Sequence, residues 1–498
     1  MSESKQLKSI TKKVIWLFAI GQLGWSLMSA VLTNFIEQFY QPDNRSVFEG
    51  MEYFIPQGRV ILGIVTIIGG IYALGRVFDA ITDPWIGNLS DKSKNPKGRR
   101  IPFMKKAAIP LTLITIMVYI CPMRGYDASS ALEKVKNGYG YVLNGAHVSN
   151  TTAYAKLVNP ALGNGGIVNA VWVLVMMLLF YLFMTIYCTP YNALIAELSR
   201  DEKTLANIST AISFTFIFGS ALGYMAPTVW GALTPVVGSR VWAMRIVFIV
   251  MAVIAMICCL IPTLTIKETD YIDAVPTDGS AFSSLGKCFS NKNFRFFVGS
   301  DICYWVGITM FQTGLLHYVT VLMKLDDAYS TILYIAMTLL SVVCYVPVNK
   351  LMQKLPKKKL VVFAFVGMCI VFLITGLSGL FGVPGIVSGI LVVVFAAFPM
   401  AILGIIPQTI VADIAKSDSI TTGENHDGMF FAARTFSMKL GQSLAILLFT
   451  SLGTIGVATG RGYRIAAFAA VIFCAAGAVI LHFYNEKKVQ DILKKANY

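Results

Sequence analysis

Long apolar runs separated by short polar segments recur along the whole chain. Many of these runs are about 20 residues or longer, which is enough to cross roughly 30 Å of hydrocarbon as an α-helix. Backbone groups in a bilayer must pair within their own segment, so the runs are predicted to be helices. We therefore expect an all-α polytopic membrane protein. The twelve predicted helices lie at residues 14–40, 59–89, 101–122, 167–197, 206–236, 241–266, 293–323, 329–352, 359–381, 385–414, 427–456 and 463–485.

The composition excludes several classes of protein. Only 13% of the 498 residues are charged, whereas a soluble chain has roughly a quarter of its residues charged. The net charge of +15 does not predict a nucleic-acid partner, because the basic residues lie between apolar runs, as they do beside a bilayer. The nine cysteines form no CxxC pair, so neither disulfides nor a zinc site are predicted. No motif of a phosphate-binding loop, zinc protease or serine hydrolase occurs, so we expect no enzyme activity and no cofactor.

Three basic segments predict the orientation of the chain. They lie between the second and third helices (91–106), after the eighth helix (350–359) and in the tail (487–495). With twelve helices, all three segments and both termini fall on the same side of the membrane. Because basic loops stay in the cytoplasm, we expect a multi-pass protein of the cell membrane with both termini cytoplasmic.

Two polar segments interrupt the pattern. Residues 267–292 are predicted to be a cytoplasmic linker between a six-helix half, 1–266, and a second half with its tail, 293–498. Residues 123–166 form an unusually long external loop, which is either a disordered insert or a lid over a substrate. A basic loop follows the second helix of each half, as GNLSDKSKNPKGRR and NKLMQKLPKKK, which favours two repeated halves.

Charged residues inside the second helix are the strongest functional signal. Asp79 and Asp83 are four residues apart and share a face, with Arg76 one turn earlier and Thr82 beside them. A carboxylate deep in a bilayer costs on the order of 2.5–3.5 kcal/mol, and one guanidinium leaves the pair net negative. Carboxylate and hydroxyl oxygens suit a hard cation such as Na⁺, and H⁺ is the alternative. The pair could also be a structural brace, which is the role expected for Asp91 in the loop.

Two basic residues lie in the eleventh helix. Arg434 and Lys439 are five residues apart and point to different faces, and Thr435 shares the face of Lys439. Lys439 lies well inside the apolar run and requires an anionic partner, for which the acidic pair of the second helix is the candidate. Arg434 could instead extend its side chain to the cytoplasmic interface.

Polar and aromatic residues of the seventh and fourth helices are candidate contacts for a solute. On the seventh helix, Asp301 and Trp305 either line a cavity or serve packing, and His317 is expected at the external interface. On the fourth helix, Tyr187, Tyr191 and Asn192 surround Pro190, a residue tolerated where a helix lines a cavity. The two tyrosines could equally be packing residues.

The stretch RVFDAITDPWIGNLSDKSKNPKGRR resembles the glycoside–pentoside–hexuronide:cation symporter family of the major facilitator superfamily. That family carries an R-x-x-D-A-x-x-D-P-x-x-G signature on its second helix, followed by a basic loop. The segments CTPYNALIAELSRDEKTLAN and TTGENHDGMFFAARTFSMKLG resemble the family in both halves. The resemblance implies twelve helices in two halves, with a solute site between the halves near the midplane.

The resemblance also implies roles for individual residues. Asp79 and Asp83 would bind the coupling cation together with Thr185. Thr82 stands where family members have an asparagine that helps to select Na⁺, so both Na⁺ and H⁺ stay open. Lys439 matches a lysine that approaches the cation and sugar sites, and Thr435 matches a threonine near the sugar.

The positions that bind a galactoside in the family differ here. Its two aspartates correspond to Leu23 and Cys188, its tryptophan to Asn192 and its arginine to Ser213. Carboxylates and arginine make the charge-assisted bonds that fix sugar hydroxyls, so these differences argue against a melibiose-like galactoside.

We therefore expect a monomeric secondary transporter that moves a sugar or glycoside-like solute with a monovalent cation across the lipid bilayer. The alternatives are a cation-independent uniporter or exchanger, a carrier of a lipid-like or anionic solute, and a transporter-like receptor that binds a partner through residues 123–166.

Overall fold

Long helices dominate the computed structural model. It describes residues 8–135, 138–143, 146–148, 151–198, 202–272, 288–423, 427–456 and 459–495. Each predicted span has a helical counterpart among them, so the prediction of membrane helices is confirmed. The long helices are α1 (Lys12–Tyr40), α3 (Ile67–Asp91), α4 (Ile101–Val118), α5 (Thr151–Leu198), α6 (Glu202–Tyr224), α7 (Ala226–Val237), α8 (Arg240–Thr265), α11 (Lys292–His317), α12 (Ala328–Met352), α13 (Lys357–Leu377), α14 (Gly385–Thr422), α15 (Asp427–Gly453) and α16 (Arg461–His482).

Several helix boundaries differ from the prediction. The second helix begins at Ile67 and not at residue 59, because Gly58 and Gly63 adopt positive φ angles of 84° and 70° in the preceding loop. The helix α5 begins at residue 151 and is kinked at Gly163, where φ is 51°. The fifth predicted helix is divided into α6 and α7 at Met225, directly before a helix start that contains a proline.

The long segment 123–166 contains regular structure. The strand β1 (Glu52–Tyr53) pairs antiparallel with β2 (Tyr126–Asp127). The strands β3 (Leu132–Val135), β4 (Gly138–Leu143) and β5 (Ala146–Val148) form an antiparallel sheet in that order. Among the described residues of this segment, the interpretation as a disordered insert is therefore wrong.

The chain divides into two compact units. Unit 1 comprises residues 1–36, 81–124 and 171–280, and unit 2 comprises 37–80, 125–170 and 281–498. The helices α1, α3 and α5 contribute residues to both units. The predicted division at 267–292 remains a prediction, and residues 273–287 of that linker lie outside the described residues.

Unit 1 has a core of small and aromatic residues. Phe18 and Ala19 of α1, Met104 of α4, and Tyr187 and Tyr191 of α5 belong to one buried cluster. Close approach of the helices depends on glycine: a Cβ on Gly24 of α1 would lie 2.6 Å from the carbonyl oxygen of Ala255 in α8.

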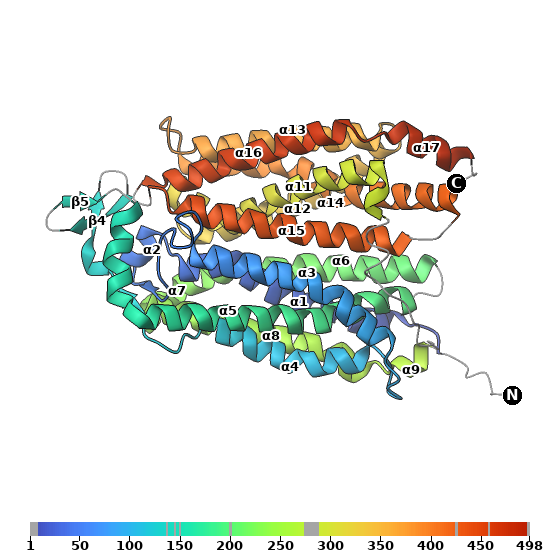
Figure 1. Cartoon of the computed structure of the whole chain (residues 1–498), viewed down its shortest axis with the longest axis horizontal. Helices are drawn as coiled ribbons and strands as arrows, with labels where there is room; N and C mark the ends of the chain where they lie inside the picture. Colours follow the sequence, from blue (N-terminus) through green and yellow to red (C-terminus); the bar gives the residue numbers. More distant parts are fainter. Residues whose placement is uncertain are drawn as a thin grey trace. The chain divides into compact units, whose positions relative to one another are not determined.

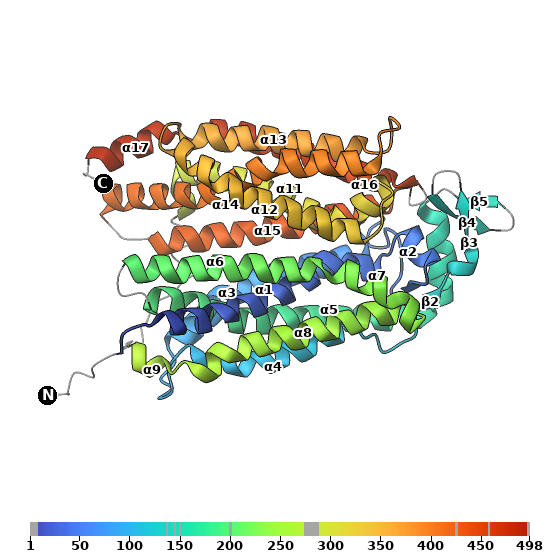
Figure 2. The same cartoon turned by 180° about the vertical axis from the view of Figure 1, so that it is seen from behind.

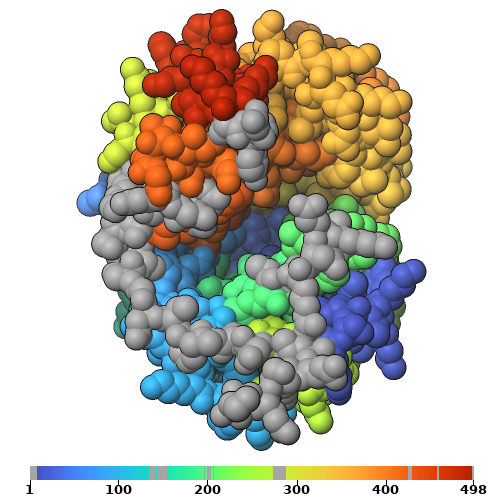
Figure 3. All heavy atoms as spheres, turned by 90° about the vertical axis from the view of Figure 1, so that its right-hand side faces the viewer, coloured from blue at the N-terminus to red at the C-terminus, as the bar shows by residue number. Residues whose placement is uncertain are grey.

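Unit 2 is a bundle in which α11 packs against α15 and α16, and α13 packs against α14 and α16, as Figures 1 and 2 show. The short helices α2 (Asn44–Phe48) and α17 (Glu486–Lys495) also belong to it. The helix α17, dark red in Figure 3, packs on α14, and its residues Val489 and Leu493 are buried.

Nine of the described helical spans are long and apolar enough to cross a membrane by themselves. The three long helices outside this set are α3, α11 and α15. These are the helices that carry the charged residues singled out above. Large apolar side chains also remain exposed, for example Val343, Phe363 and Ile472 at 66%, 57% and 69%, as expected for helices that face lipid.

Candidate transport site

Asp79 is the centre of a buried group of charges in unit 2. Lys439 Nζ, from α15, lies 2.8 Å from Asp79 Oδ2, and Arg76 Nη1 lies 3.7 Å from the same oxygen. Asp79 and Lys439 expose only 5% and 7% of their surface. Charges at such positions in membrane helices are tolerated when they pair with one another. The structure thus gives Lys439 a carboxylate partner on α3, and its role in coupling stays a prediction.

Tyr72 contacts Arg76, and a further hydrogen bond links α15 to α3 near Lys439. Arg76 Nη2 lies 3.1 Å from the hydroxyl of Tyr72, and its guanidinium lies 5.5 Å from the centroid of that ring. One turn after Lys439, Ser443 Oγ donates to the carbonyl oxygen of Ala73 at 3.2 Å. These contacts fix α15 against the first part of α3.

Two cationic side chains therefore face one carboxylate. The sequence predicted Arg76 as partial compensation and the acidic pair of the second helix as the partner of Lys439, and in the structure the ammonium of Lys439 pairs with Asp79. The ammonium of Lys439 already contacts Asp79 Oδ2, and binding of a mobile cation at the same carboxylate stays a prediction.

Asp83, Thr82 and Thr185 belong to unit 1. Asp83 is half-buried and lies one turn after Asp79 along α3. Thr189 of α5 donates its hydroxyl to Asp83 Oδ1 at 3.3 Å, while Thr82 and Thr185 are 5% and 1% exposed. Thr189 is not among the residues predicted from the sequence. The available signal was its position four residues after Thr185, on the same face of the helix.

A second buried ion pair joins α11 to α15. Arg434 Nε and Nη2 donate to the two carboxylate oxygens of Asp301 at 2.9 and 3.0 Å. The side chains are 10% and 2% exposed, so the interpretation that Arg434 extends to the interface is wrong. Such bidentate pairs are strong and geometrically specific. Trp305 lies one turn after Asp301 and is half-buried. A solute contact by Asp301 or Trp305 stays a prediction.

Tyr187 and Tyr191 are fully buried in unit 1. Their hydroxyls donate to the carbonyl oxygens of Cys259 at 2.8 Å and Phe18 at 3.0 Å. The ring of Tyr191 also stacks on that of Phe18, with centroids 4.4 Å apart. In this structure the two tyrosines pack α5 against α1 and α8.

The other predicted solute contacts lie on several helices. The half-buried thiol of Cys188 lies 3.4 Å from the sulfur of Met184. Asn192, Ser213 and Thr435 are exposed. Their role in solute binding stays a prediction. Within the described part of the chain, no group of three or more His, Cys, Asp or Glu residues is placed to hold a metal ion.

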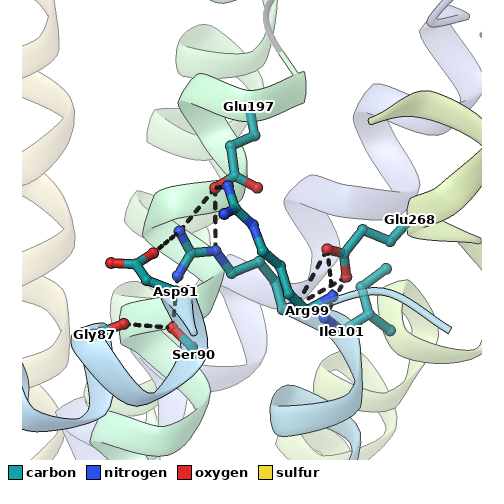
Figure 4. A network of polar contacts seen from close by, with 8 residues as sticks. Gly87, Ser90, Asp91, Arg99, Ile101, Glu197 and Glu268 are labelled. Carbon is teal, nitrogen blue, oxygen red and sulfur yellow. Dashed lines mark hydrogen bonds and ion pairs between the residues drawn. The ribbon is translucent and has the colours of Figure 1, made fainter. Parts of the chain in front are cut away.

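A polar network in unit 1 surrounds the start of α4 (Figure 4). Arg100 Nη2 lies 2.8 Å from Glu197 Oε1 and 2.5 Å from Asp91 Oδ1, and Arg99 Nη2 lies 2.8 Å from the same oxygen of Glu197. The expectation that Asp91 is an ion-paired structural residue is confirmed.

Glu268 of the short helix α9 (Glu268–Tyr271) completes this network. The backbone N–H groups of Arg99, Arg100 and Ile101 donate to its carboxylate at 2.8, 2.9 and 2.9 Å. The first N–H groups of a helix lack partners within the helix, so Glu268 caps α4 from a distant part of the sequence. Gly98, with a φ of 113°, allows the close approach, because a Cβ there would lie 2.3 Å from Glu268 Oε2.

The fold and the buried charges define a polytopic helical membrane protein of the transporter class. The sequence matches the family described as MFS/sugar transport protein over residues 17–133 and 140–485, and the chain belongs to that family. The resemblance to glycoside–pentoside–hexuronide:cation symporters is thereby confirmed.

Relatives named as symporters agree with this assignment. An uncharacterized symporter of Synechocystis sp. is 22% identical over 460 residues, which cover 76% of this chain and 77% of the relative. The Escherichia coli protein YagG, named as a glycoside/cation symporter, is 34% identical over 56 residues, or 11% of this chain and 12% of YagG.

Solved structures show the same fold. A D-xylose–proton symporter matches with a TM-score of 0.61 at 14% identity, covering 96% of this chain and 98% of that protein. The xylose transporter XylE from E. coli matches with a TM-score of 0.58 at 14% identity, covering 93% and 95%. These likenesses show the major facilitator fold.

Proposed function

We propose that the protein is a secondary active symporter, which moves a sugar or glycoside-like solute together with Na⁺ or H⁺ by alternating access. Membership of the transporter family and the relatives named as symporters support this function. The observation that carries the coupling proposal is the buried ion pair between Lys439 and Asp79.

Competition between the transported cation and the ammonium of Lys439 for the Asp79 carboxylate provides a physical route to coupling. When a cation takes Asp79 Oδ2, with Asp83 one turn further along α3 as the second carboxylate, the ammonium of Lys439 is released. Thr435 lies one turn before Lys439 on the same helix. The released ammonium can therefore change the position of the polar groups on this face of α15, which would contact a solute. Coupling free energies are reciprocal: the cation raises solute affinity by the factor by which the solute raises cation affinity.

Transport by proteoliposomes tests this proposal. Uptake is measured with an imposed Na⁺ gradient, with an imposed H⁺ gradient and with neither, for the wild type, Asp79→Asn and Asp83→Asn. We expect accumulation driven by one of the gradients in the wild type and its loss in both variants. The matched control is Asp326→Asn, which removes a carboxylate that is 79% exposed. Accumulation without a gradient, or full coupling in Asp83→Asn, would contradict the proposal.

The charge balance at Asp79 favours one second candidate, a cation-independent uniporter or exchanger. Arg76 and Lys439 already supply two positive charges to Asp79, so the group could serve as a brace that never binds a mobile cation. This candidate predicts that solute equilibrates but does not accumulate under either gradient.

A ligand-binding screen identifies the class of solute. Sugars, uronates and lysolipids are added to the purified protein with and without Na⁺, and the thermal unfolding midpoint is measured. A ligand that binds the folded state raises this midpoint by mass action. We expect a glycoside-like compound to raise it, with a larger effect when the coupling cation is present. A response to lipids or anions alone would redirect the proposal to a non-sugar carrier.

The basic segments support the proposed location and orientation. The protein lies in the cell membrane, and both termini lie in the cytoplasm. Protease accessibility of tags placed at residues 1 and 498, in sealed cells and in inverted vesicles, tests it. Cleavage of both tags only in inverted vesicles is expected.

A further inference from the structure

Unit 2 contains a buried cluster of ionisable groups that the proposed transport cycle does not use. His317, the last residue of α11, has its Nε2 in hydrogen-bond contact with Glu37 Oε2 from the last turn of α1. Its Nδ1 lies 3.4 Å from Asp43 Oδ2, just before α2. The side chains of His317, Glu37 and Asp43 are 0%, 1% and 3% exposed. His317 is therefore buried inside the protein at the end of α11, and its position at the external membrane interface stays a prediction.

Aromatic residues enclose the cluster. The ring of Tyr463 in α16 stacks on the imidazole with centroids 4.6 Å apart and planes at 11°, and Phe449 of α15 lies 6.0 Å away. Among the described residues, the titratable groups near the cluster on other elements are the phenols of Tyr154 on α5, Tyr318 after α11 and Tyr463 on α16. These walls keep the local dielectric low, so the net charge of the cluster strongly affects its energy.

The positions of the ring nitrogens limit the protonation states. A neutral imidazole has one N–H and one acceptor nitrogen, yet here both nitrogens face carboxyl oxygens. If both carboxyl groups were ionised and the imidazole neutral, one lone pair of nitrogen would face a carboxylate and the buried cluster would carry two negative charges. At least one further proton is needed, either on the imidazole or on a carboxyl group, and a second would make the cluster neutral.

The two carboxyl groups have different surroundings. Asp43 Oδ1 accepts the backbone N–H of Ser46 at 2.8 Å and caps the start of α2, which favours its ionised form. Glu37 Oε1 is buried and has no hydrogen-bond partner among the described residues. A carboxylate in that position would be poorly solvated, so Glu37 is the group that gains most from holding a proton.

The backbone beside His317 is unusual as well. The α-helix gives way to a π-helical turn at Tyr318–Leu322, and Lys324 follows with a φ of 57°. Turns of this type occur often at functional sites. Gly385 packs directly on this turn, since a Cβ there would lie 1.9 Å from the carbonyl oxygen of Met323. The end of α11 is thus held in one arrangement around the cluster.

We propose that His317, Glu37 and Asp43 form a proton-binding site, separate from Asp79 and Lys439, in which a proton shared between Glu37 and His317 holds the end of α11 against the end of α1. Loss of that proton leaves facing acceptor atoms and an unbalanced buried charge, so His317 has to move away from its partners. The site stands independently of the solute and of the cation that drives transport. It is a proton site and not a metal site, because the imidazole nitrogens point to two different carboxyl groups.

Infrared difference spectroscopy on the full-length protein in nanodiscs tests the proposal. The pH is stepped upward from about pH 5 to about pH 11, because two carboxyl groups facing the imidazole hold its proton beyond the range of a free histidine. Na⁺ and any solute are absent. The spectra are compared for the wild type, Glu37→Gln, Asp43→Asn and His317→Asn. The matched control is Asp326→Asn, whose carboxylate pairs with Arg45 at 2.8 Å and is exposed.

We expect the wild type and Asp326→Asn to lose a C=O band of a protonated carboxylic acid as the pH rises, together with imidazole bands. Glu37→Gln should lack the carboxyl band, and His317→Asn should lack the imidazole bands and shift the carboxyl titration. Identical difference spectra for the wild type, Glu37→Gln and Asp43→Asn would overturn the proposal. If Glu37→Gln does not fold, a titration in Asp43→Asn that is indistinguishable from that of the wild type would overturn it equally.

Discussion

Lys439 and Asp79 form a buried ion pair with an ammonium-to-carboxylate distance of 2.8 Å, although they are 360 positions apart in the chain. Removing charges from water is costly, so each of these side chains is tolerated in the protein interior because the other is present. The same dependence means that removal of the lysine leaves the Asp79 carboxylate without its ammonium partner.

Lys439→Gln should therefore create a cation requirement. Removing one partner of a buried pair costs about 3–5 kcal/mol, because it leaves an uncompensated charge, and Arg76 at 3.7 Å replaces only part of the interaction. We expect a lower thermal unfolding midpoint in choline chloride and a recovery in NaCl of the same ionic strength that is larger than in the wild type.

The double variant Lys439→Gln/Asp79→Asn is the control for this prediction. It lacks both charges of the pair, so its unfolding midpoint should be the same in the two salts. An equal midpoint for Lys439→Gln itself in NaCl and choline chloride would show that Asp79 does not attract a free monovalent cation.

Asp301→Asn should destabilise unit 2 by disrupting the bidentate pair with Arg434, whose N–H groups lie 2.9 and 3.0 Å from the carboxylate. The expected loss is about 3–5 kcal/mol, since a buried guanidinium is left unpaired. Adding Arg434→Gln should recover part of this loss, because the changes in unfolding free energy caused by substitutions in one ion pair are not additive. Reversible unfolding in denaturant measures all three variants, and strict additivity of the two single changes would contradict the prediction.

The sequence predicts the helices well and their starts poorly. Hydropathy identifies the long runs because lipid requires continuous apolar helices. It assigns residues 59–66 to the second helix, yet this apolar stretch is a loop in which Leu62 is 90% exposed. Local backbone conformation decides the outcome: Gly63 adopts a positive φ, and Ile61 bridges to Val65. Apolar composition does not distinguish such a loop from a helix.

The sequence also identifies the charged residues better than their partners. The cost of a buried charge indicates that Lys439 requires an acidic neighbour, and the acidic candidates in the helices are few. The environment of His317 is not accessible in this way, because Glu37 lies 280 residues away near a helix end. A glutamate near a helix end is ordinarily expected at the membrane surface, and only the contact of Glu37 with His317 inside unit 2 shows that it is buried.

Glu268→Gln should weaken the start of α4. The Glu268 carboxylate accepts N–H groups from Arg99, Arg100 and Ile101, and a neutral amide offers a single oxygen and no charge to these donors. Loss of a capping interaction lowers the stability of a helix or protein by about 0.5–2 kcal/mol. Hydrogen exchange of the amides of residues 99–101, 103 and 104 should accelerate, while Pro102 has no amide hydrogen. Asp270→Asn is the control in the same short helix, because Asp270 pairs at 2.8 Å with Lys8, which is 66% exposed, and it should leave this exchange unchanged. Equal rates in the wild type and Glu268→Gln would contradict the capping role.

Gly24→Ala should destabilise unit 1, whereas Gly231→Ala should not. Both glycines lie within helices, where alanine is intrinsically favoured by roughly 0.5–1 kcal/mol. At Gly24 a Cβ would lie 2.6 Å from the carbonyl oxygen of Ala255 and 2.9 Å from the backbone nitrogen of Cys259. Backbone atoms cannot yield as a flexible side chain can, so α1 and α8 must separate.

Overpacking of this kind costs about 1–3 kcal/mol, which exceeds the gain in helix propensity. At Gly231 of α7 a Cβ would meet nothing within 4 Å, so only the gain in helix propensity from glycine to alanine remains. Thermal unfolding of the two variants should therefore shift in opposite directions from the wild type. A midpoint for Gly24→Ala at or above that of Gly231→Ala would show that the contact between α1 and α8 is looser than these distances require.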